Sequence, residues 1–531
     1  MIVHPTKPYL ALNLRQPEAV LNTIPTAKLK EHKGRKFVIV PHKLDETVVL
    51  RRLGINAPSP IESRYEWLGS PQKTVMSHQR TTASFLTVNR RAFVFNGMGS
   101  GKTLSALHAA EYLMKIGKVH KVLIVCPLST MQRAWGDEIF DNFMHRKYAI
   151  LHGPRDKRLK LLASPVDYYI VNHDGVALPW MVSALLERGD IDLVIADEAS
   201  LYRNARTTRY KAFEKLTNRP NVRLWMMTAT PCPNAPTDAW ALARLVDKGS
   251  TPKFFKAFQE QVMHQASTYK WVPRPEGLRL AFAAMQPAIR FSTRDCIELP
   301  PTTYIPRSAP LTEDQQKAYN QMHRTFTMEA KGTGASKIVA ANAAVKIFKL
   351  LQIACGVVRT GEGNDVYEMD ATPRMSVVRE VIEEAGGKTI VFVPFKAVMT
   401  SVAEYLVSSG DLESRQVAVV SGDTSLSERN DIFYRFQNDP DLRVIVAHPK
   451  CMSHGLTLTE ANTIVWFAPY PSNEITEQAN GRIVRPGQKR HTNIVEIEAT
   501  SVEREMYKAL RSKQKISGAI MELYRNEFGV K

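Results

Sequence analysis

The sequence predicts an α/β protein with two lobes, each a parallel β-sheet covered by helices, together with helical insertions and a small N-terminal domain. Three observations lead to this prediction. Short apolar, β-prone runs alternate with helical stretches in two separate parts of the chain, which is typical of parallel sheets. One run leads directly into a glycine-rich turn. The length of 531 residues is too great for one core, so several domains are expected.

The composition favours a polyanionic partner. The 71 Lys and Arg residues exceed the 52 Asp and Glu residues, giving a net charge of +19. Nucleic acid explains this excess better than a membrane surface, although a generally solvated basic surface is the alternative. No apolar run reaches the ~18 residues of a membrane span, and the N-terminus lacks a signal-peptide pattern. The five single cysteines indicate neither zinc nor disulfides, so we expect a cytoplasmic protein.

Residues 1–70 are predicted to form an accessory domain with a possible role in DNA binding. Residues 33–40 and 47–50 have the composition of short strands, and a proline-rich linker follows at residues 56–60. The basic side chains here that suit phosphate contacts are Arg35, Lys36, Arg51 and Arg52. An ordinary solvated face is an equally good interpretation of them.

The first lobe, predicted at residues 71–247, contains a candidate phosphate-binding loop. An apolar run at residues 92–95 precedes it and a helix-period run follows it. The loop residues are Gly97, Met98, Gly99, Ser100, Gly101, Lys102 and Thr103. Glycines let backbone N–H groups approach phosphate oxygens, Lys102 is expected to reach the β- and γ-phosphates, and the Thr103 hydroxyl to ligate magnesium. Asn96 departs from the usual glycine, and a turn that binds nothing is the alternative.

Polar residues follow each predicted strand of this lobe, where ligands bind in parallel sheets. The strands are expected at residues 122–126, 168–171, 193–196 and 224–227. Asp197 and Glu198 follow the third strand. Asp197 is expected to hold magnesium through water and Glu198 to deprotonate an attacking water; a surface acidic pair is the alternative. Gln79, upstream of the loop, is expected to bond adenine.

Beyond this lobe, residues 248–375 are predicted to be mainly helical and residues 376–500 to form the second lobe. Its strands are expected at residues 389–393, 416–420, 444–447, 463–467 and 493–497, and a C-terminal helix at residues 501–531. Arg482 and Arg485 are expected on one helix face, directed at a γ-phosphate held by the first lobe. Two solvent-facing arginines are the alternative.

Together these motifs resemble superfamily 2 helicases, specifically the Swi/Snf-type, chromatin-remodeller-like DNA translocases with two RecA-like lobes. The resemblance covers residues 77–512 and rests on motifs in the family's order. They are residues 97–103; Pro127, Ser129, Trp135 and Glu138; residues 197–200; residues 228–231 with Asn234 and Trp240; residues 299–301; residues 421–423 with Arg429 and Phe436; residues 453–458; and Gln478, Gly481, Arg482, Arg485, Gly487 and Gln488. Ser200 stands where the family usually has histidine, which leaves the coupling of the lobes open.

The resemblance implies ATP and Mg²⁺ as cofactors and assigns further roles. Catalytic positions are Lys102, Glu198, Gln478, Arg482 and Arg485; Thr103, Asp197 and Glu198 face the metal; Gln79, residues 97–103 and Gly455 face the nucleotide. Predicted nucleic-acid contacts are Ser129, Thr130, Thr228, Thr230 and Ser421.

The function implied is ATP-driven translocation on duplex DNA without sequence preference, DNA being preferred to RNA. A bacterial or bacteriophage source is expected, and no protein partner or membrane is indicated. The alternatives are a strand-separating helicase on forked DNA or RNA, a non-catalytic nucleic-acid scaffold, and a P-loop kinase or transport ATPase. The last does not explain a second lobe with an arginine pair.

Overall fold

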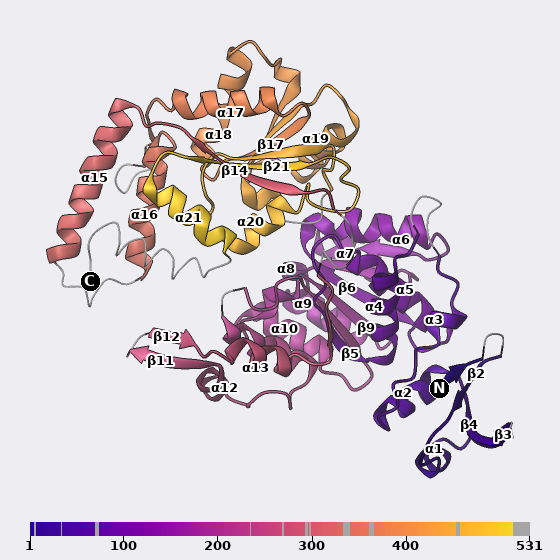
Figure 1. Cartoon of the computed structure of the whole chain (residues 1–531). Helices are drawn as coiled ribbons and strands as arrows, with labels where there is room; N and C mark the ends of the chain where they lie inside the picture. The colour runs from indigo at the N-terminus through magenta and orange to yellow at the C-terminus, as the bar shows by residue number, and fades with distance from the viewer. Residues whose placement is uncertain are drawn as a thin grey trace. The chain divides into compact units, whose positions relative to one another are not determined.

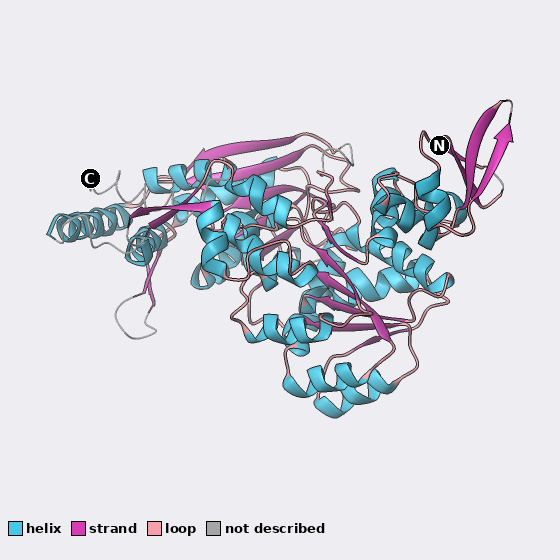
Figure 2. Ribbon diagram, turned by 90° about the horizontal axis from the view of Figure 1, so that it is seen from below, coloured by secondary structure: helices cyan, strands magenta, loops and turns pink. Residues whose placement is uncertain are grey.

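The computed structural model describes residues 1–512, except 5–6, 33, 69–73, 234, 268–269, 293–295, 297–298, 333–339, 360–365 and 453–456. The chain divides into two units, Met1–Cys296 and Ile297–Lys531 (Figure 1). Each unit contains one large parallel sheet covered by helices, as Figure 2 shows by the strands in magenta and the helices in cyan. The predicted fold class is therefore confirmed.

The first unit begins with a small domain built on a four-stranded antiparallel sheet of order β1-β2-β4-β3. Its elements are β1 (Ile2–Val3), β2 (Tyr9–Leu12), α1 (Glu18–Thr23), β3 (Lys28–His32), β4 (Arg35–Pro41), α2 (Leu44–Arg52) and α3 (Ile61–Arg64). Leu44 of α2 and Ile61 of α3 pack into the core of the following lobe, and Ser59 Oγ and Thr87 Oγ1 are 2.7 Å apart. The domain is therefore attached to the lobe through helix α4.

The predicted strand at residues 47–50 is wrong, because these residues lie in helix α2. Leu44, Thr47 and Leu50 are the buried residues of this helix, and they recur at helical spacing. Asp45 and Glu46 stand in its first turn and Arg51 and Arg52 in its last, where each sign of charge stabilises the helix dipole. These effects outweigh the β propensity of the paired valines.

The large sheet of the first unit has the order β13-β5-β10-β9-β6-β8-β7, with every strand pair parallel. The strands are β5 (Arg91–Val94), β6 (Lys121–Cys126), β7 (Tyr148–Ile150), β8 (Tyr168–Asn172), β9 (Ile191–Asp197), β10 (Arg223–Met227) and β13 (Ala288–Ile289). The covering helices are α4 (Ser77–Val88), α5 (Lys102–Lys115), α6 (Asp137–Asn142), α7 (Arg155–Ala163), α8 (His173–Val176), α9 (Pro179–Glu187), α10 (Thr208–Thr217), α11 (Ala239–Val246), α12 (Phe255–Val262) and α13 (Gly277–Ala284). A π-helix spans Met131–Gly136.

Alternate residues of each strand enter separate cores on the two faces of this sheet. On β5, Phe93 belongs to one core, while Ala92 and Val94 belong to the other. The sheet is thus buried on both faces, as expected for parallel strands with long apolar runs. A two-stranded hairpin, β11 (Met263–Ser267) with β12 (Lys270–Pro273), stands beside α12 and α13.

The second unit has a six-stranded sheet of order β14-β21-β20-β17-β19-β18, again with every pair parallel. The strands are β14 (Thr302–Ser308), β17 (Lys388–Phe392), β18 (Val417–Val420), β19 (Val444–Ala447), β20 (Ala461–Trp466) and β21 (Thr492–Glu498). The other elements are α15 (Glu313–Gly332), α16 (Ala340–Ala354), β15 (Val357–Arg359), β16 (Val366–Glu368), α17 (Thr372–Glu384), α18 (Lys396–Ser408), α19 (Leu426–Asn438), α20 (Asn473–Asn480) and α21 (Ser501–Arg511).

The stretch 248–375, predicted to be mainly helical, also supplies strands to both large sheets. β13 joins the edge of the first sheet beside β5, and β14 joins the second sheet beside β21. β13 has only two residues, and β14 shows no alternation of apolar and polar residues, which is why composition favoured helices here. The predicted C-terminal helix begins as α21, and its part beyond residue 512 lies outside the described residues.

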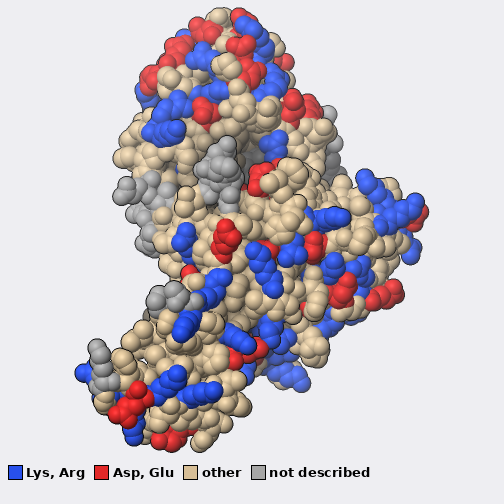
Figure 3. All heavy atoms as spheres, turned by 90° about the vertical axis from the view of Figure 1, so that its right-hand side faces the viewer, with Lys and Arg blue, Asp and Glu red and all other residues tan. Residues whose placement is uncertain are grey.

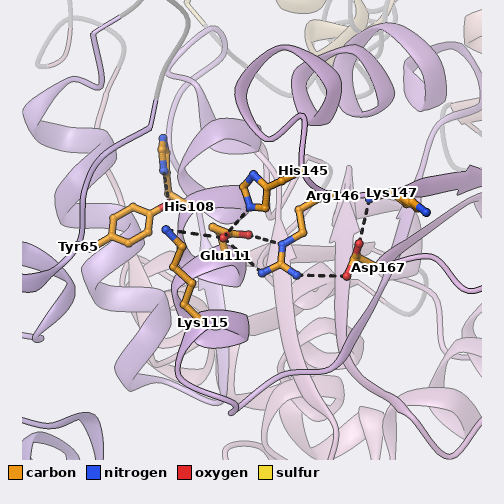
Figure 4. A network of polar contacts seen from close by, with 8 residues as sticks. All are labelled: Tyr65, His108, Glu111, Lys115, His145, Arg146, Lys147 and Asp167. Carbon is orange, nitrogen blue, oxygen red and sulfur yellow. Dashed lines mark hydrogen bonds and ion pairs between the residues drawn. The ribbon is translucent and has the colours of Figure 1, made fainter.

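Both units contain a buried ion pair. In the first, the fully buried Glu111 of α5 accepts hydrogen bonds from Arg146 and His145, and Arg146 also pairs with Asp167 (Figure 4). In the second, Arg374 of α17 lies 2.8 Å from Glu503 of α21. These pairs fasten α5 and α21 to their lobes.

The charge excess is dispersed on the face drawn in Figure 3. Lys and Arg side chains spread widely there, with Asp and Glu among them. No helix within the described ranges is long and apolar enough to cross a membrane.

Candidate nucleotide site

The loops that carry the predicted site in the first unit meet at one edge of the large sheet. Val94 of β5 pairs with Met227 of β10, and Met227 pairs with Asp197 of β9. Thr228 N–H donates to the Val94 carbonyl at 3.0 Å. The phosphate loop, Thr228 and Asp197 therefore leave three adjacent strands at the same level, as the strand order of such sheets predicts.

The phosphate loop has the conformation that its glycines permit. Gly99 and Gly101 have φ values of 72° and 73°, which side chains with a Cβ rarely adopt. A Cβ at Gly101 would stand 1.9 Å from Gln79 Nε2. Gly101 is thus required by its backbone, and a side chain there would also have to displace the Gln79 amide. Helix α5 starts directly after it.

The Lys102 side chain folds back onto the phosphate loop and forms hydrogen bonds to its first carbonyls. Its Nζ donates to the carbonyls of Asn96 and Gly97, each at 3.0 Å. Thr103 stands beside it in the first turn of α5, half-buried. An ammonium group, a hydroxyl and the N-terminus of a helix of 14 residues suit a phosphate chain with its cation. Among the described residues no cluster of three metal-ligating side chains occurs. Mg²⁺ in such sites needs few, because phosphates and water complete its shell.

Asn96, the departure from the usual glycine, is a fully buried structural bridge. Its Nδ2 donates to Thr82 Oγ1 of α4 at 2.9 Å, and its Oδ1 accepts the N–H of Phe291 at 3.0 Å. The side chain therefore joins the start of the phosphate loop to a helix before it and to a segment nearly two hundred residues after it. Glycine could make neither bond.

Gln79 contacts the phosphate loop, and its side-chain amide forms hydrogen bonds to backbone groups of this chain. Its Oε1 accepts the Met76 N–H at 2.9 Å, and its Nε2 lies 3.4 Å from the Ser100 carbonyl. The neighbouring His78 was not predicted, although its Nε2 donates to the same carbonyl at 2.8 Å. No sequence pattern signals this bond. The role of Gln79 toward adenine stays a prediction.

Asp197 and Glu198 stand at the end of β9, as predicted. Trp135 Nε1 donates to Asp197 Oδ2 at 3.2 Å, and the Glu198 N–H donates to Asp197 Oδ1 at 3.1 Å. The Trp135 side chain is fully buried in the π-helix. Its indole therefore fixes the carboxylate that is predicted to face the metal.

Glu198 has φ of 52°, in the left-handed region. It alone among the described non-glycine residues has a positive φ. Such a backbone costs roughly 1–2 kcal/mol in a residue with a Cβ and recurs at functional sites. Ser200 lies nearby, and its buried hydroxyl forms no hydrogen bond within the described part of the chain.

The side chains predicted to contact nucleic acid differ in their exposure. Thr130 and Thr228 are buried, and their hydroxyls bond the Pro127 carbonyl and the Thr230 N–H. In this conformation they shape the turns after β6 and β10. Ser129, Thr230 and Ser421 are half-buried, and Ser421 Oγ accepts the Asp423 N–H. Contacts from these five residues stay predictions.

In the second unit the predicted helix ends earlier than expected. α20 stops at Asn480, so Arg482 and Arg485 lie in the turns beyond it, not on one helix face. The Asn480–Gly481 pair favours helix termination, and Pro486 disfavours helical backbone at Arg485. Gln478 is buried in α20, and its carbonyl accepts Arg482 Nε at 2.8 Å. Burial lowers the pKa of Arg485 to about 10. Gly455 and Asn234 lie outside the described residues.

Comparison with known proteins identifies the family. Residues 78–356 match the SNF2-related domain, and residues 373–487 match the helicase conserved C-terminal domain. Protein p41 of Acyrthosiphon pisum secondary endosymbiont phage 1 is 26% identical over 80% of this chain and 91% of its own length. The DNA repair and recombination protein RAD54-like of Danio rerio is 24% identical over 85% of this chain and 67% of its own length.

An uncharacterized ATP-dependent helicase of Mycoplasma genitalium is 24% identical over 79% of this chain, which spans 39% of that relative. Among solved structures, the Sulfolobus solfataricus SWI2/SNF2 ATPase core in complex with dsDNA is 19% identical. It covers 87% of this chain and 98% of its own, with a TM-score of 0.39. The SNF2-related domain alone matches more than half of the sequence. This chain therefore belongs to the SNF2-related family and is an ATP-hydrolysing enzyme.

Proposed function

We propose that this protein hydrolyses ATP to move along double-stranded DNA without sequence preference. The observation that carries the proposal is the meeting of the phosphate loop, Thr228 and the Asp197–Glu198 pair at one sheet edge. A loop for phosphates beside a metal-facing carboxylate and a candidate base has the parts of a nucleoside triphosphatase.

The residues present fit ATP with Mg²⁺. The loop at residues 97–103 would hold the phosphates, while Thr103 and Asp197 would face the cation. When bound, the cation neutralises charge on the phosphates. Lys102 would exchange its two carbonyl partners for phosphate oxygens, Trp135 would hold the Asp197 carboxylate still, and Glu198 would take a proton from the attacking water.

We assign the second unit an arginine contribution to the same reaction. Arg482 and Arg485 would stabilise charge on the γ-phosphate, for which a positioned arginine can be worth ~10³–10⁵ in rate. The lowered pKa of Arg485 reflects desolvation of its guanidinium group. An arriving phosphate would offset that cost. Arg482 is supported from α20, because the Gln478 carbonyl accepts its Nε–H.

DNA is the proposed track because the chain is strongly basic and a relative is named as a DNA repair and recombination protein. Contacts would be made mainly to phosphates, which carry no sequence information. The candidate positions are the half-buried Ser129, Thr230 and Ser421, with Thr130 and Thr228 supporting their turns.

ATPase measurements with single-stranded DNA, blunt duplex, forked DNA and RNA as separate stimulants test this function. We expect the strongest stimulation by duplex. Lys102→Ala and Glu198→Gln should each abolish hydrolysis, whereas Glu198→Gln should still bind ATP. Lys160→Ala and Glu187→Gln change exposed residues of the same unit and should leave turnover unchanged. Normal turnover in Lys102→Ala or Glu198→Gln would refute the site.

A strand-separating helicase is the second candidate, because residues 373–487 match a helicase domain and relatives are named helicases. The two functions differ in what happens to the duplex. Displacement of a third strand from a triplex reports translocation, and release of one strand from a forked duplex reports unwinding. Triplex displacement without unwinding supports translocation.

A further inference from the structure

One face of the sheet of the N-terminal domain carries no buried side chain among the described residues. Its other face is the domain core, in which Leu10, Leu12, Val38 and Val40 pack with residues of α1 and α2. We call the side without buried side chains the open face. It is defined by Tyr9, Lys28, Lys30, His32, Arg35, Phe37 and Ile39, which are all exposed or half-buried.

On the open face, the strand register places the Phe37 ring next to basic side chains. Phe37 pairs with Lys30 across β3 and β4, and Arg35 pairs with His32. Paired residues of antiparallel strands share a face, and residues two apart on one strand do too. Phe37 therefore has Lys30 opposite it and Arg35 beside it, and Lys28 pairs with Ile39 further along.

The single acidic residue of β3 and β4 lies on the opposite face of the sheet. Glu31, the carboxylate of β3, pairs with Lys36, and both alternate with the residues of the open face. On the open face, β3 and β4 thus present cations and no carboxylate, because Glu31 lies on the other face. An ordinary solvated surface mixes the two signs of charge, so this segregation indicates a polyanion.

We propose that the open face binds single-stranded DNA. Cations along a strand suit a phosphate backbone, and an accessible aromatic ring suits an unpaired base, which can stack on it. A duplex hides its base faces and would use the cations alone. The choice of DNA rests on the proposed function. The charged, fully exposed strand β3 is a poor edge for pairing with another protein.

Fluorescence anisotropy of the full-length protein with labelled oligo-dT tests the cations. Arg35 and Lys36 are adjacent exposed residues on opposite faces, so Arg35→Gln and Lys36→Gln form a matched pair. Replacing Lys28, Lys30 and Arg35 with glutamine should flatten the slope of log K against log salt by about 2, since each single-strand phosphate contact contributes about 0.7. Lys36→Gln should leave the slope unchanged: the sequence alone grouped Lys36 with Arg35, but the strand register places Lys36 on the other face, opposite Glu31.

Phe37→Leu tests stacking. We expect about tenfold weaker binding of oligo-dT, within the range for loss of one stacked base, and unchanged binding of a blunt duplex. Thermal unfolding checks that the variants fold. Should Phe37→Leu unfold the domain, the exposed glutamine variants still decide the question.

An oligonucleotide containing 5-iododeoxyuridine, irradiated with the full-length protein, gives a site-specific readout. The proposal expects a crosslinked peptide within residues 28–41. Three results would overturn it: no crosslink there, equal effects of Arg35→Gln and Lys36→Gln, or competition by blunt duplex as effective as by oligo-dT. An ATPase that duplex DNA does not stimulate contradicts the proposed function instead, and leaves the crosslink to decide this proposal.

Discussion

At the scale of single residues, the two carboxylates predicted to serve the metal and the attacking water have unusual surroundings. Glu198 holds a left-handed backbone, and Asp197 receives hydrogen bonds from the Glu198 N–H and the Trp135 indole. Both effects restrict the pair to one arrangement before any nucleotide arrives. Such preorganisation reduces the cost of orienting groups during the reaction.

Trp135→Phe should weaken this arrangement. The ring stays apolar and nearly fills the space, but the donor to Asp197 is lost. We expect the Mg²⁺ concentration for half-maximal binding of a fluorescent ADP to rise about tenfold, as for other outer partners of metal ligands. Trp225→Phe is the control, because it removes an indole N–H that donates to the Asn89 carbonyl and not to Asp197. An unchanged Mg²⁺ dependence in Trp135→Phe would contradict the positioning role.

Asn96→Gly restores the glycine that the phosphate-loop pattern expects, yet it should destabilise the first unit. It removes the bonds to Thr82 and Phe291. The Thr82 hydroxyl keeps its bond to the His78 carbonyl, whereas the half-buried Phe291 N–H loses the acceptor on Asn96. We expect a loss of about 2–3 kcal/mol in the free energy of unfolding, measured with urea. Thr82→Val removes only one of the two bonds and should cost less.

At the scale of elements, most strands could be predicted, and long-range contacts could not. Buried runs such as Val122–Cys126 and Val444–Ala447 carry their signal in consecutive apolar residues, and the structure places β6 and β19 there. The Trp135–Asp197 contact joins residues far apart through a π-helix, for which no sequence signal is known. The sequence identified Arg482 and Arg485 but wrongly predicted a helical backbone for them, because weak local preferences decide where a helix ends.

Glu111 fastens helix α5, which begins at the phosphate loop, to the rest of its lobe. Burial alone would raise the pKa of Glu111, but hydrogen bonds from Arg146 and His145 outweigh burial and lower it (Figure 4). A carboxyl with a lowered pKa in the folded state stabilises the fold above its ordinary value of 4.5. That stabilisation is lost as the pH falls through the folded-state pKa.

Glu111→Gln should therefore destabilise the first unit by about 2–3 kcal/mol at pH 7, because it removes charge-assisted hydrogen bonds. The difference from the unsubstituted protein should shrink as the pH is lowered below 4.5. Urea denaturation at several pH values measures it. Glu187→Gln, at an exposed position, should show no such trend. A difference that grows in acid would contradict the assigned sign.

At the scale of the whole molecule, the charge of +19 predicts how binding depends on salt. If about six phosphates of a duplex are contacted, log K should fall with log salt at a slope of about −5. The slope is measured by the fluorescence anisotropy of a labelled blunt duplex over a salt range of roughly 50 to 200 mM. Binding that is insensitive to salt would contradict contacts to the DNA backbone.

The bridge made by Asn96 has a mechanical consequence. The Gly97 N–H donates to the Phe291 carbonyl while Asn96 accepts the Phe291 N–H, so the loop and this segment are joined by a pair of bonds. Phe291 precedes Cys296, the last residue of the first unit, by only a few positions. The start of the phosphate loop is therefore tied to the chain close to the end of the first unit. Asn96, the departure from glycine, thus restrains the phosphate loop from both sides within the first unit, through Thr82 before it and Phe291 after it.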